Sequence, residues 1–327
     1  MQDGIDVSTR RLEIKLQREL GPDILAALAD PLVVEIMLNP DGQIWVEKMG
    51  QGMATVGTMT ATAAECLMGT IADGLKTVVT REKPILEGEL PGDPEKFKGA
   101  GSRFEGLLPP LVARPSFTLR KKASAIFSLQ KYVDDGVMTE QQRLQIIEAV
   151  KTRQNILVVG GTSSGKTTFL NAVIACIVDV TPEHRLVIIE DTAEIQCSAK
   201  NTTPLRTSEN CDMQRLLRAT MRLRPDRILV GEVRGGEALA LLKAWNTGHP
   251  GGFATVHANS ALAGLIRMEQ LVAEGSTSPM ETLIAEAVNM VVFIEKDSTC
   301  RAGRRVKQMI RITGYDAPTK QYRFTEL

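Results

Sequence analysis

This 327-residue sequence lacks the features that mark several large classes of protein. No stretch approaches the ~20 consecutive apolar residues of a membrane-spanning helix, and the first residues lack the basic and apolar regions of a signal peptide. The five cysteines include no C-x-x-C pair, which argues against a disulfide framework or a zinc ribbon. We therefore expect a cytoplasmic protein whose cysteines are small, inert residues.

An excess of charge of one sign is also missing. Residues 1–135 contain 16 basic and 19 acidic side chains, and the remainder contains 23 and 20. Neither half has the basic excess that drives binding to nucleic acid by counterion release. Aromatic residues make up only 4% of the chain, which leaves few side chains to stack on bases. We expect no direct sequence-specific binding to nucleic acid.

What the sequence does contain is a phosphate-binding loop (P-loop) of the form G-x4-G-K-T, between a strand-like apolar run and a helix-like run. Backbone N–H groups of such a loop surround an anion, and the next helix directs the positive end of its dipole there. We expect Lys166 to neutralise β- and γ-phosphate oxygens of ATP and the Thr167 hydroxyl to ligate Mg²⁺. The full spacing disfavours the alternative, a glycine-rich turn before an ordinary helix. The loop consists of Gly160, Gly161, Thr162, Ser163, Ser164, Gly165, Lys166, Thr167 and Thr168.

The hydrophobic pattern predicts a smaller N-terminal α+β domain over residues 1–122, a linker over 123–135 and a larger domain over 136–327. In the first domain, helical patterns over 8–29 and 62–76 accompany short strands separated by glycine- and proline-containing turns. The expected strands cover residues 33–38, 43–47, 53–56, 85–90, 102–107 and 116–120.

In the second domain, short β-branched runs alternate with helical patterns, which is typical of a mostly parallel sheet covered on both faces. A helix capped by Thr139, with Gln142 in the capping-box position, precedes the strand of the P-loop. The expected strands cover 155–159, 185–189, 227–230 and 253–256, with an antiparallel extension over 290–295, 304–313 and 321–324. The predicted fold class is α/β.

Acidic residues follow two of the predicted parallel strands. Glu190 and Glu194 follow the strand over 185–189, and Glu232 follows the strand over 227–230. Ligands bind at the carboxyl ends of such strands, and nucleotide hydrolysis needs a carboxylate for the metal's waters and one for the attacking water. All three glutamates are candidates for these roles. A solvated or helix-capping carboxylate is the alternative at each position.

His257 ends the predicted strand over 253–256 and is one of three histidines in the chain. At that position its imidazole would lie near the γ-phosphate and sense whether this phosphate is present. No metal-ligand spacing such as H-E-x-x-H accompanies it, and we expect His184 to be a structural group. A further cluster is either a solvated helix face or a set of groups that organise the carboxylates: Arg218, Arg222 and Arg224.

Four ordered segments resemble the Walker A, Asp, Walker B and His boxes of the type II and type IV secretion ATPases. They are the P-loop, residues 189–194, residues 223–235 and residues 246–259. The length and the N-terminal domain are most similar to the type IV secretion traffic ATPases, a group that serves conjugal transfer. In that domain the resemblance rests on residues 102–104, 114–115 and 116–121.

The resemblance implies a RecA-like ATPase domain in a homohexameric ring, peripheral to the inner membrane at its cytoplasmic face. Inner-membrane components of a conjugation or secretion channel would be its partners, and ATP with Mg²⁺ would lie between the two domains. Arginines delivered by domain closure would stabilise charge in the transition state. The motif match assigns Mg²⁺ to Thr167 and Glu232, water activation to Glu190 or Glu194, phosphate sensing to His257, and γ-phosphate contacts to Arg103, Arg114 and Arg120.

Two features depart from related families. Gly231 stands where many P-loop ATPases have a metal-binding Asp, and the four-cysteine zinc element of many type II and pilus-extension ATPases is absent. The missing cysteines favour the type IV branch, and the predicted function is an ATP-driven motor for pilus assembly or substrate transfer. The alternatives are a type II secretion or pilus-retraction ATPase, a nucleic-acid motor, and a monomeric P-loop switch or kinase. The Asp and His boxes argue against the last of these.

Overall fold

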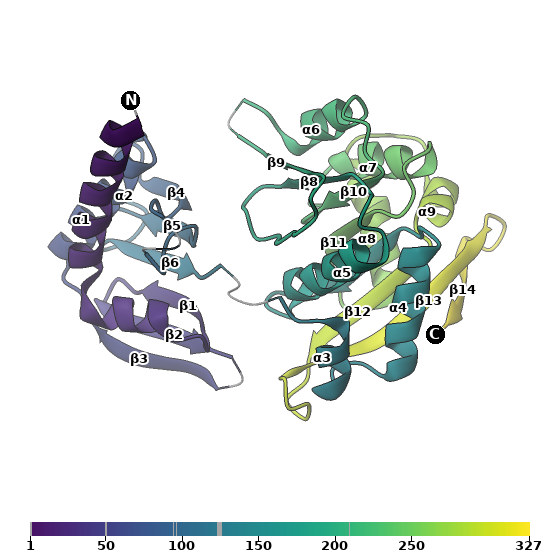
Figure 1. Cartoon of the computed structure of the whole chain (residues 1–327), viewed down its shortest axis with the longest axis horizontal. Coiled ribbons are helices and arrows are strands. Elements are labelled where there is room, and N and C mark those ends of the chain that lie inside the picture. The colour runs from purple at the N-terminus through teal and green to yellow at the C-terminus, as the bar shows by residue number, and fades with distance from the viewer. Residues whose placement is uncertain (1, 50, 94, 96, 123–125, 209) are drawn as a thin grey trace. The chain divides into compact units, whose positions relative to one another are not determined.

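The computed structural model describes the whole chain except residues 1, 50, 94, 96, 123–125 and 209, and it describes residues 2–8 by their backbone alone. The chain divides into two compact units, Met1–Ser124 and Ala125–Leu327. Figure 1 shows the elements of each unit.

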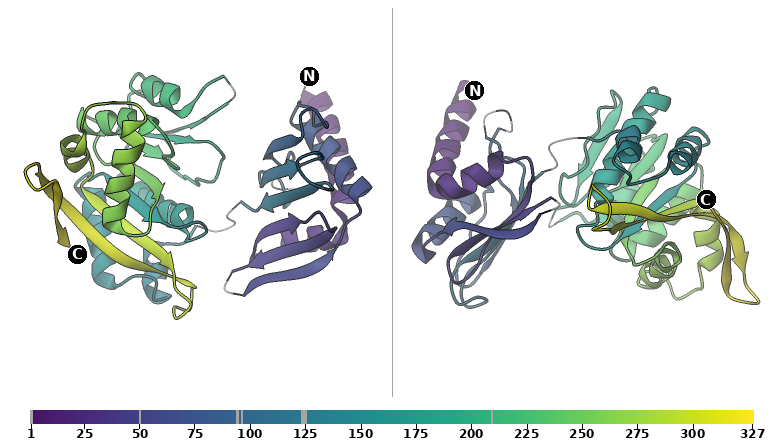
Figure 2. Two further views of the ribbon diagram at one scale, coloured as in Figure 1. Left: turned by 180° about the vertical axis from the view of Figure 1, so that it is seen from behind. Right: turned by 90° about the horizontal axis from the view of Figure 1, so that it is seen from below.

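The first unit is an antiparallel sheet of six strands in the order β3-β2-β1-β6-β5-β4, with two helices on one of its faces (Figure 2). Gly21, at φ 75°, breaks the first helix before Pro22. The elements are α1 (Gln2–Ala29), β1 (Val33–Leu38), β2 (Gln43–Lys48), β3 (Gly52–Thr58), α2 (Ala61–Gly74), β4 (Ile85–Glu89), β5 (Arg103–Leu107) and β6 (Ser116–Arg120).

Because successive side chains of a strand point to opposite faces of the sheet, every second side chain faces the helices. In β1, for example, Ile36 and Leu38 are buried with Leu16 and Ile24 of α1 in one core. Glu35 lies on the other face of the sheet, which it shares with Met37 of the same strand.

The second unit contains an eight-stranded sheet in the order β14-β13-β12-β7-β11-β10-β8-β9. Strands β12 to β9 in this order pair in parallel, and β13 and β14 add the predicted antiparallel extension. The predicted fold class is therefore confirmed. The strands are β7 (Ile156–Gly160), β8 (Leu186–Glu190), β9 (Thr202–Arg206), β10 (Arg227–Val230), β11 (Phe253–His257), β12 (Met290–Lys296), β13 (Arg304–Asp316) and β14 (Gln321–Glu326).

Helices cover both faces of this sheet, which is why its central strands are apolar on both sides. Val158 and Leu229 belong to one core with α3, α4 and α5, and Val159 and Val230 belong to the other with the remaining helices. The helices are α3 (Leu129–Asp134), α4 (Glu140–Lys151), α5 (Lys166–Val180), α6 (Met213–Thr220), α7 (Glu237–Asn246), α8 (Ala261–Ala273) and α9 (Glu281–Ala287). None of the helices among the described residues is long and apolar enough to cross a membrane.

Part of the predicted linker is a helix. Residues 123–125 lie outside the described part of the chain, but Ser128 caps α3, which buries Leu129 and Tyr132. The Tyr132 ring meets Phe169 of α5 edge-on, with 5.5 Å between ring centroids. Six residues are too few to show a helical period, so contact with α5 is what identifies this segment as part of the second unit.

Candidate active site

The P-loop leaves the carboxyl end of β7 and enters α5. A side chain at Gly160 would collide with the carbonyl oxygen of Ile294 in β12. Ser163 and Gly165 have φ values of 57° and 95°, and Gly165 is the N-cap of α5. These left-handed residues bend the backbone sharply enough for the first turn of α5 to face the loop.

Lys166 lies inside the loop and is only 8% exposed. Its Nζ donates to the carbonyl oxygens of Gly160 at 3.0 Å and Gly161 at 2.9 Å. The same Nζ lies 3.2 Å from Nδ1 of His257. In the parallel pairing of β7 with β11, His257 is directly opposite Gly160, which explains this approach.

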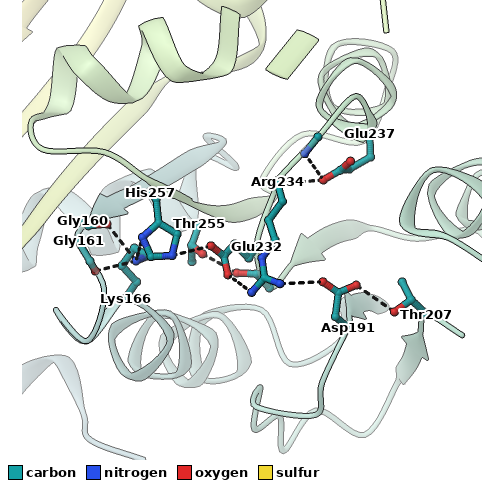
Figure 3. A network of polar contacts seen from close by, with 12 residues as sticks. Gly160, Gly161, Lys166, Asp191, Thr207, Glu232, Arg234, Glu237, Thr255 and His257 are labelled. Carbon is teal, nitrogen blue, oxygen red and sulfur yellow. Dashed lines mark hydrogen bonds and ion pairs between the residues drawn. The ribbon is translucent and has the colours of Figure 1, made fainter. Parts of the chain in front are cut away.

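A chain of polar contacts continues from His257 across the ends of β10 and β8 (Figure 3). Nε2 of His257 lies 2.8 Å from Oε1 of Glu232, and Nη2 of Arg234 donates to Oε2 of the same carboxylate at 2.6 Å. Nη1 of Arg234 lies 3.7 Å from Oδ2 of Asp191. We call Lys166, His257, Glu232, Arg234 and Asp191 the polar network.

Backbone contacts hold the segment after β10 in place. The Thr255 hydroxyl donates to the Gly231 carbonyl at 2.6 Å, and the Val233 amide donates to the Thr255 carbonyl at 2.9 Å. One carboxylate oxygen of Glu237 accepts the amides of Arg234 and Gly235, at the start of α7. Glu232 and Arg234 therefore start from a fixed backbone.

Glu190 is used differently from Glu232. It is 6% exposed, and its carboxylate accepts the backbone amides of Glu194 at 2.7 Å and Ile195 at 3.0 Å. Burial raises the pKa of Glu190 to about 7, although these amide donors act in the opposite direction. Glu190 therefore anchors the loop after β8, and the partly buried Glu194 makes no side-chain hydrogen bond to a described residue.

The loop also fits a phosphate ligand and Mg²⁺. The Ser164 hydroxyl is buried without a hydrogen-bond partner among the described residues, a costly condition that a phosphate oxygen would relieve. The Thr167 hydroxyl and the Glu232 carboxylate are the hard oxygen donors that Mg²⁺ prefers. No cluster of three His, Cys, Asp or Glu ligands occurs in the described part of the chain. Mg²⁺ tolerates this, because it keeps several waters and binds substrate phosphates.

The three predicted arginines lie in the first unit, and two of them are neighbours there. Arg103 of β5 is directly opposite Arg120 of β6, on the face of the sheet that carries Glu35. Arg120 lies 3.5 Å from Glu35, its partner in β1. Arg114 instead lines a hollow of about 330 Å³ with Asp41 and other residues.

The structure thus brings together Lys166, His257 and Glu232, but gives Glu190 a buried structural position. Sequence reasoning assigned no role to Arg234, although its place two residues after Glu232 was a usable signal. The cluster suggested as an organiser of the carboxylates is exposed, and its members Arg218, Arg222 and Arg224 form no ion pair with a described residue. Arg234 organises the carboxylates instead.

Comparison with known proteins gives consistent similarities. The family model described as "Type II/IV secretion system protein" matches residues 19–323. A probable conjugal transfer protein TrbB of Sinorhizobium fredii is 55% identical, covering 92% of this chain and 90% of its own. The type IV secretion system protein VirB11 of Bartonella quintana is 31% identical, covering 77% of this chain and 79% of its own. In fold, the chain is similar to the ADP-bound pilus retraction motor PilT, with TM-score 0.57, 18% identity and coverage of 93% and 80%.

Proposed function

The chain belongs to the type II/IV secretion system protein family, and from this we propose that its polar network hydrolyses ATP in a hexameric motor of conjugation or type IV secretion. It is an ATPase of the type IV secretion and conjugation class. The proposal concerns the catalytic roles of the polar network and the assembly of the chain into a hexamer.

The observation that carries the proposal is the continuous contact from Lys166 through His257 to Glu232 and Arg234. It joins the phosphate-binding lysine to a carboxylate at the ends of three adjacent strands, β7, β11 and β10. Phosphate oxygens would compete with the Gly160 and Gly161 carbonyls for the Lys166 ammonium. Binding of a γ-phosphate therefore changes the contacts of His257 and, through it, of Glu232.

Glu232 is the residue we assign to the attacking water. Its side chain is partly exposed just after β10, whereas Glu190 is buried against backbone amides. His257 and Arg234 orient its two oxygens, so one carboxylate geometry is favoured before the substrate arrives. Bound Mg²⁺, held by Thr167 and Glu232, would neutralise charge on the phosphates. Arg103, Arg114 and Arg120 are proposed to supply further positive charge to the γ-phosphate.

We place the motor as a hexamer at the cytoplasmic face of an inner membrane, acting on membrane components of the channel. The support is similarity to proteins named for conjugal transfer and type IV secretion. Its cargo would be transferred by the channel, so the ATPase need not bind nucleic acid itself.

Release of phosphate from ATP by the purified chain tests the assignment. We expect Lys166→Ala to abolish binding and turnover, because the loop loses its phosphate counter-charge. Glu232→Gln should lower kcat by roughly 100- to 10,000-fold, the usual range for loss of general-base catalysis, while ADP affinity changes little.

Lys243→Ala is the matched control, since Lys243 is exposed on α7. It should hydrolyse ATP like the unaltered chain. Normal turnover by Glu232→Gln would contradict the role of Glu232, and turnover by Lys166→Ala would contradict the use of the P-loop.

A further inference from the structure

The polar network occupies one side of the P-loop strand. In the sheet, β11, β10 and β8 follow β7 on one side, and they carry His257, Glu232 and Glu190 at their ends. β12 and β13 lie on the other side of β7. If the terminal phosphate meets His257, groups on the β12 and β13 side of the P-loop are available to contact the rest of the nucleotide.

Arg304 reaches the P-loop from that second side. Arg304 is the first residue of β13. Its guanidinium extends to the P-loop, because a side chain at Gly165 would collide with its Nη1 atom. Its charge also acts on the buried Tyr132 phenol of α3, lowering a pKa that burial raises. The guanidinium thus lies beside the N-cap of α5, within reach of an anion in the loop.

The turn before Arg304 is tied down. The amide of Asp297 donates to the Gly303 carbonyl at 3.0 Å, and the amide of Gly303 donates to the Cys300 carbonyl at 2.8 Å. The Val306 amide donates to the Val137 carbonyl at 2.7 Å, which joins β13 to the segment before α4. Backbone hydrogen bonds therefore fix the chain both before and after Arg304.

The charge of Arg304 is not balanced locally. No carboxylate of the described residues forms an ion pair with it, whereas the adjacent Arg305 pairs with Asp297 at 3.0 Å. The N-terminus of α5 adds positive partial charge at the same place. Placing a guanidinium there is unfavourable without an anion, and favourable with a diphosphate between the two.

We propose that Arg304 binds the α- and β-phosphates of the nucleotide, on the side of the P-loop opposite to His257 and Glu232. This rests on the proposed function, because it requires that the P-loop holds a nucleotide. The guanidinium fork suits adjacent phosphate oxygens, and ADP and ATP both carry these two groups. Arg304 therefore contributes equally to substrate and product binding.

Calorimetric titration of the full chain with ADP and with a non-hydrolysable ATP analogue, both with Mg²⁺, tests this proposal. Arg304→Gln should weaken both affinities by the same factor, roughly 10- to 100-fold for a lost charge-assisted contact. Arg304→Lys should lose less, since a point charge remains. Arg305→Ala, whose side chain is exposed and paired elsewhere, should bind both nucleotides within about twofold of the unaltered chain.

Unchanged ADP affinity in Arg304→Gln, or a loss confined to the ATP analogue, would overturn the proposal. If Arg304→Gln does not fold, as judged by circular dichroism, Arg304→Met, which also removes the charge, takes its place with the same expected and contradicting results. Failure of the unaltered chain to bind ADP, or normal binding by Lys166→Ala, would refute the proposed function itself.

Discussion

The two nitrogens of His257 face groups of opposite charge. Because the Lys166 ammonium has only donors, Nδ1 accepts from it, and Nε2 carries the proton that is donated to Glu232. One neutral tautomer thus links the phosphate-binding lysine to the carboxylate. The sequence predicted that His257 lies near the phosphate site, but not that its imidazole contacts both Lys166 and Glu232.

Glu190 should make stability depend on pH. Its pKa of about 7 lies above the 4.5 of an ordinary glutamate, so the folded state holds a proton that the unfolded state has released. The free energy of unfolding therefore falls by on the order of 3 kcal/mol as pH rises from about 4.5 to 7. Above that range Glu190 causes no further change. Glu190→Gln keeps an oxygen acceptor for the amides and should lack this fall.

Chemical unfolding of both proteins between pH 4.5 and 8 measures the effect. The difference in unfolding free energy should grow with pH in favour of Glu190→Gln. Glu194→Gln serves as the control, because Glu194 makes no side-chain hydrogen bond to a described residue. A parallel pH profile for Glu190→Gln and the unaltered chain would show that Glu190 ionises normally.

At the scale of elements, a buried arginine sets the position of β11. Arg227 is fully buried, and its guanidinium donates to His184, to the Gly251 carbonyl at 3.1 Å and to the Val150 carbonyl at 2.9 Å. Burial lowers its pKa to about 10. A side chain at Gly251 would collide with Nη1 of Arg227. The glycine therefore lets the turn before β11 approach the Arg227 guanidinium. β11 in turn carries His257. The expected structural role of His184 agrees with this contact.

Replacing Gly264 of α8 tests how closely this helix packs on β7. A Cβ on Gly264 would press on Cγ1 of Val159, beside the P-loop, whereas one on Gly69 of α2 would meet nothing within 4 Å. Gly264→Ala should destabilise the second unit by about 1–3 kcal/mol through overpacking. Gly69→Ala should stabilise the first by about 0.5–1 kcal/mol, because alanine is the better helix former.

Differential scanning calorimetry reads both effects, since ΔΔG of this size moves a melting temperature by several degrees. Opposite shifts for the two substitutions are expected. An upward shift for Gly264→Ala would mean that α8 and β7 can separate enough to accept a methyl group.

For the whole molecule, the proposed ring predicts a change in mass. Light scattering should give about six times the 35.7 kDa of one chain, appearing or sharpening with Mg²⁺ and a non-hydrolysable ATP analogue. Nucleotide that is shared or sensed between subunits adds its binding energy to assembly. Lys166→Ala should show no nucleotide effect. A monomer under every condition would contradict the hexamer and favour a P-loop switch.

The sequence alone predicted the fold class, nearly every strand, the helix cap at Thr139 and the P-loop. These follow from neighbours in the chain: hydrophobic period, turn residues and the G-x4-G-K-T spacing. It missed β9, an edge strand with Pro204, and α9, which at seven residues is too short for a clear period. Such elements exist because larger ones give them a surface to pack on.

Only the tertiary structure decided which charged groups meet. Glu190 ends β8 and Glu232 closely follows β10, but the first carboxylate accepts backbone amides and the second faces His257 and Arg234. Arg304 reaches Gly165 because β13 lies beyond β12 in the sheet. Strand order and side-chain burial arise from contacts between distant segments, so local spacing could locate the candidates but could not assign their partners.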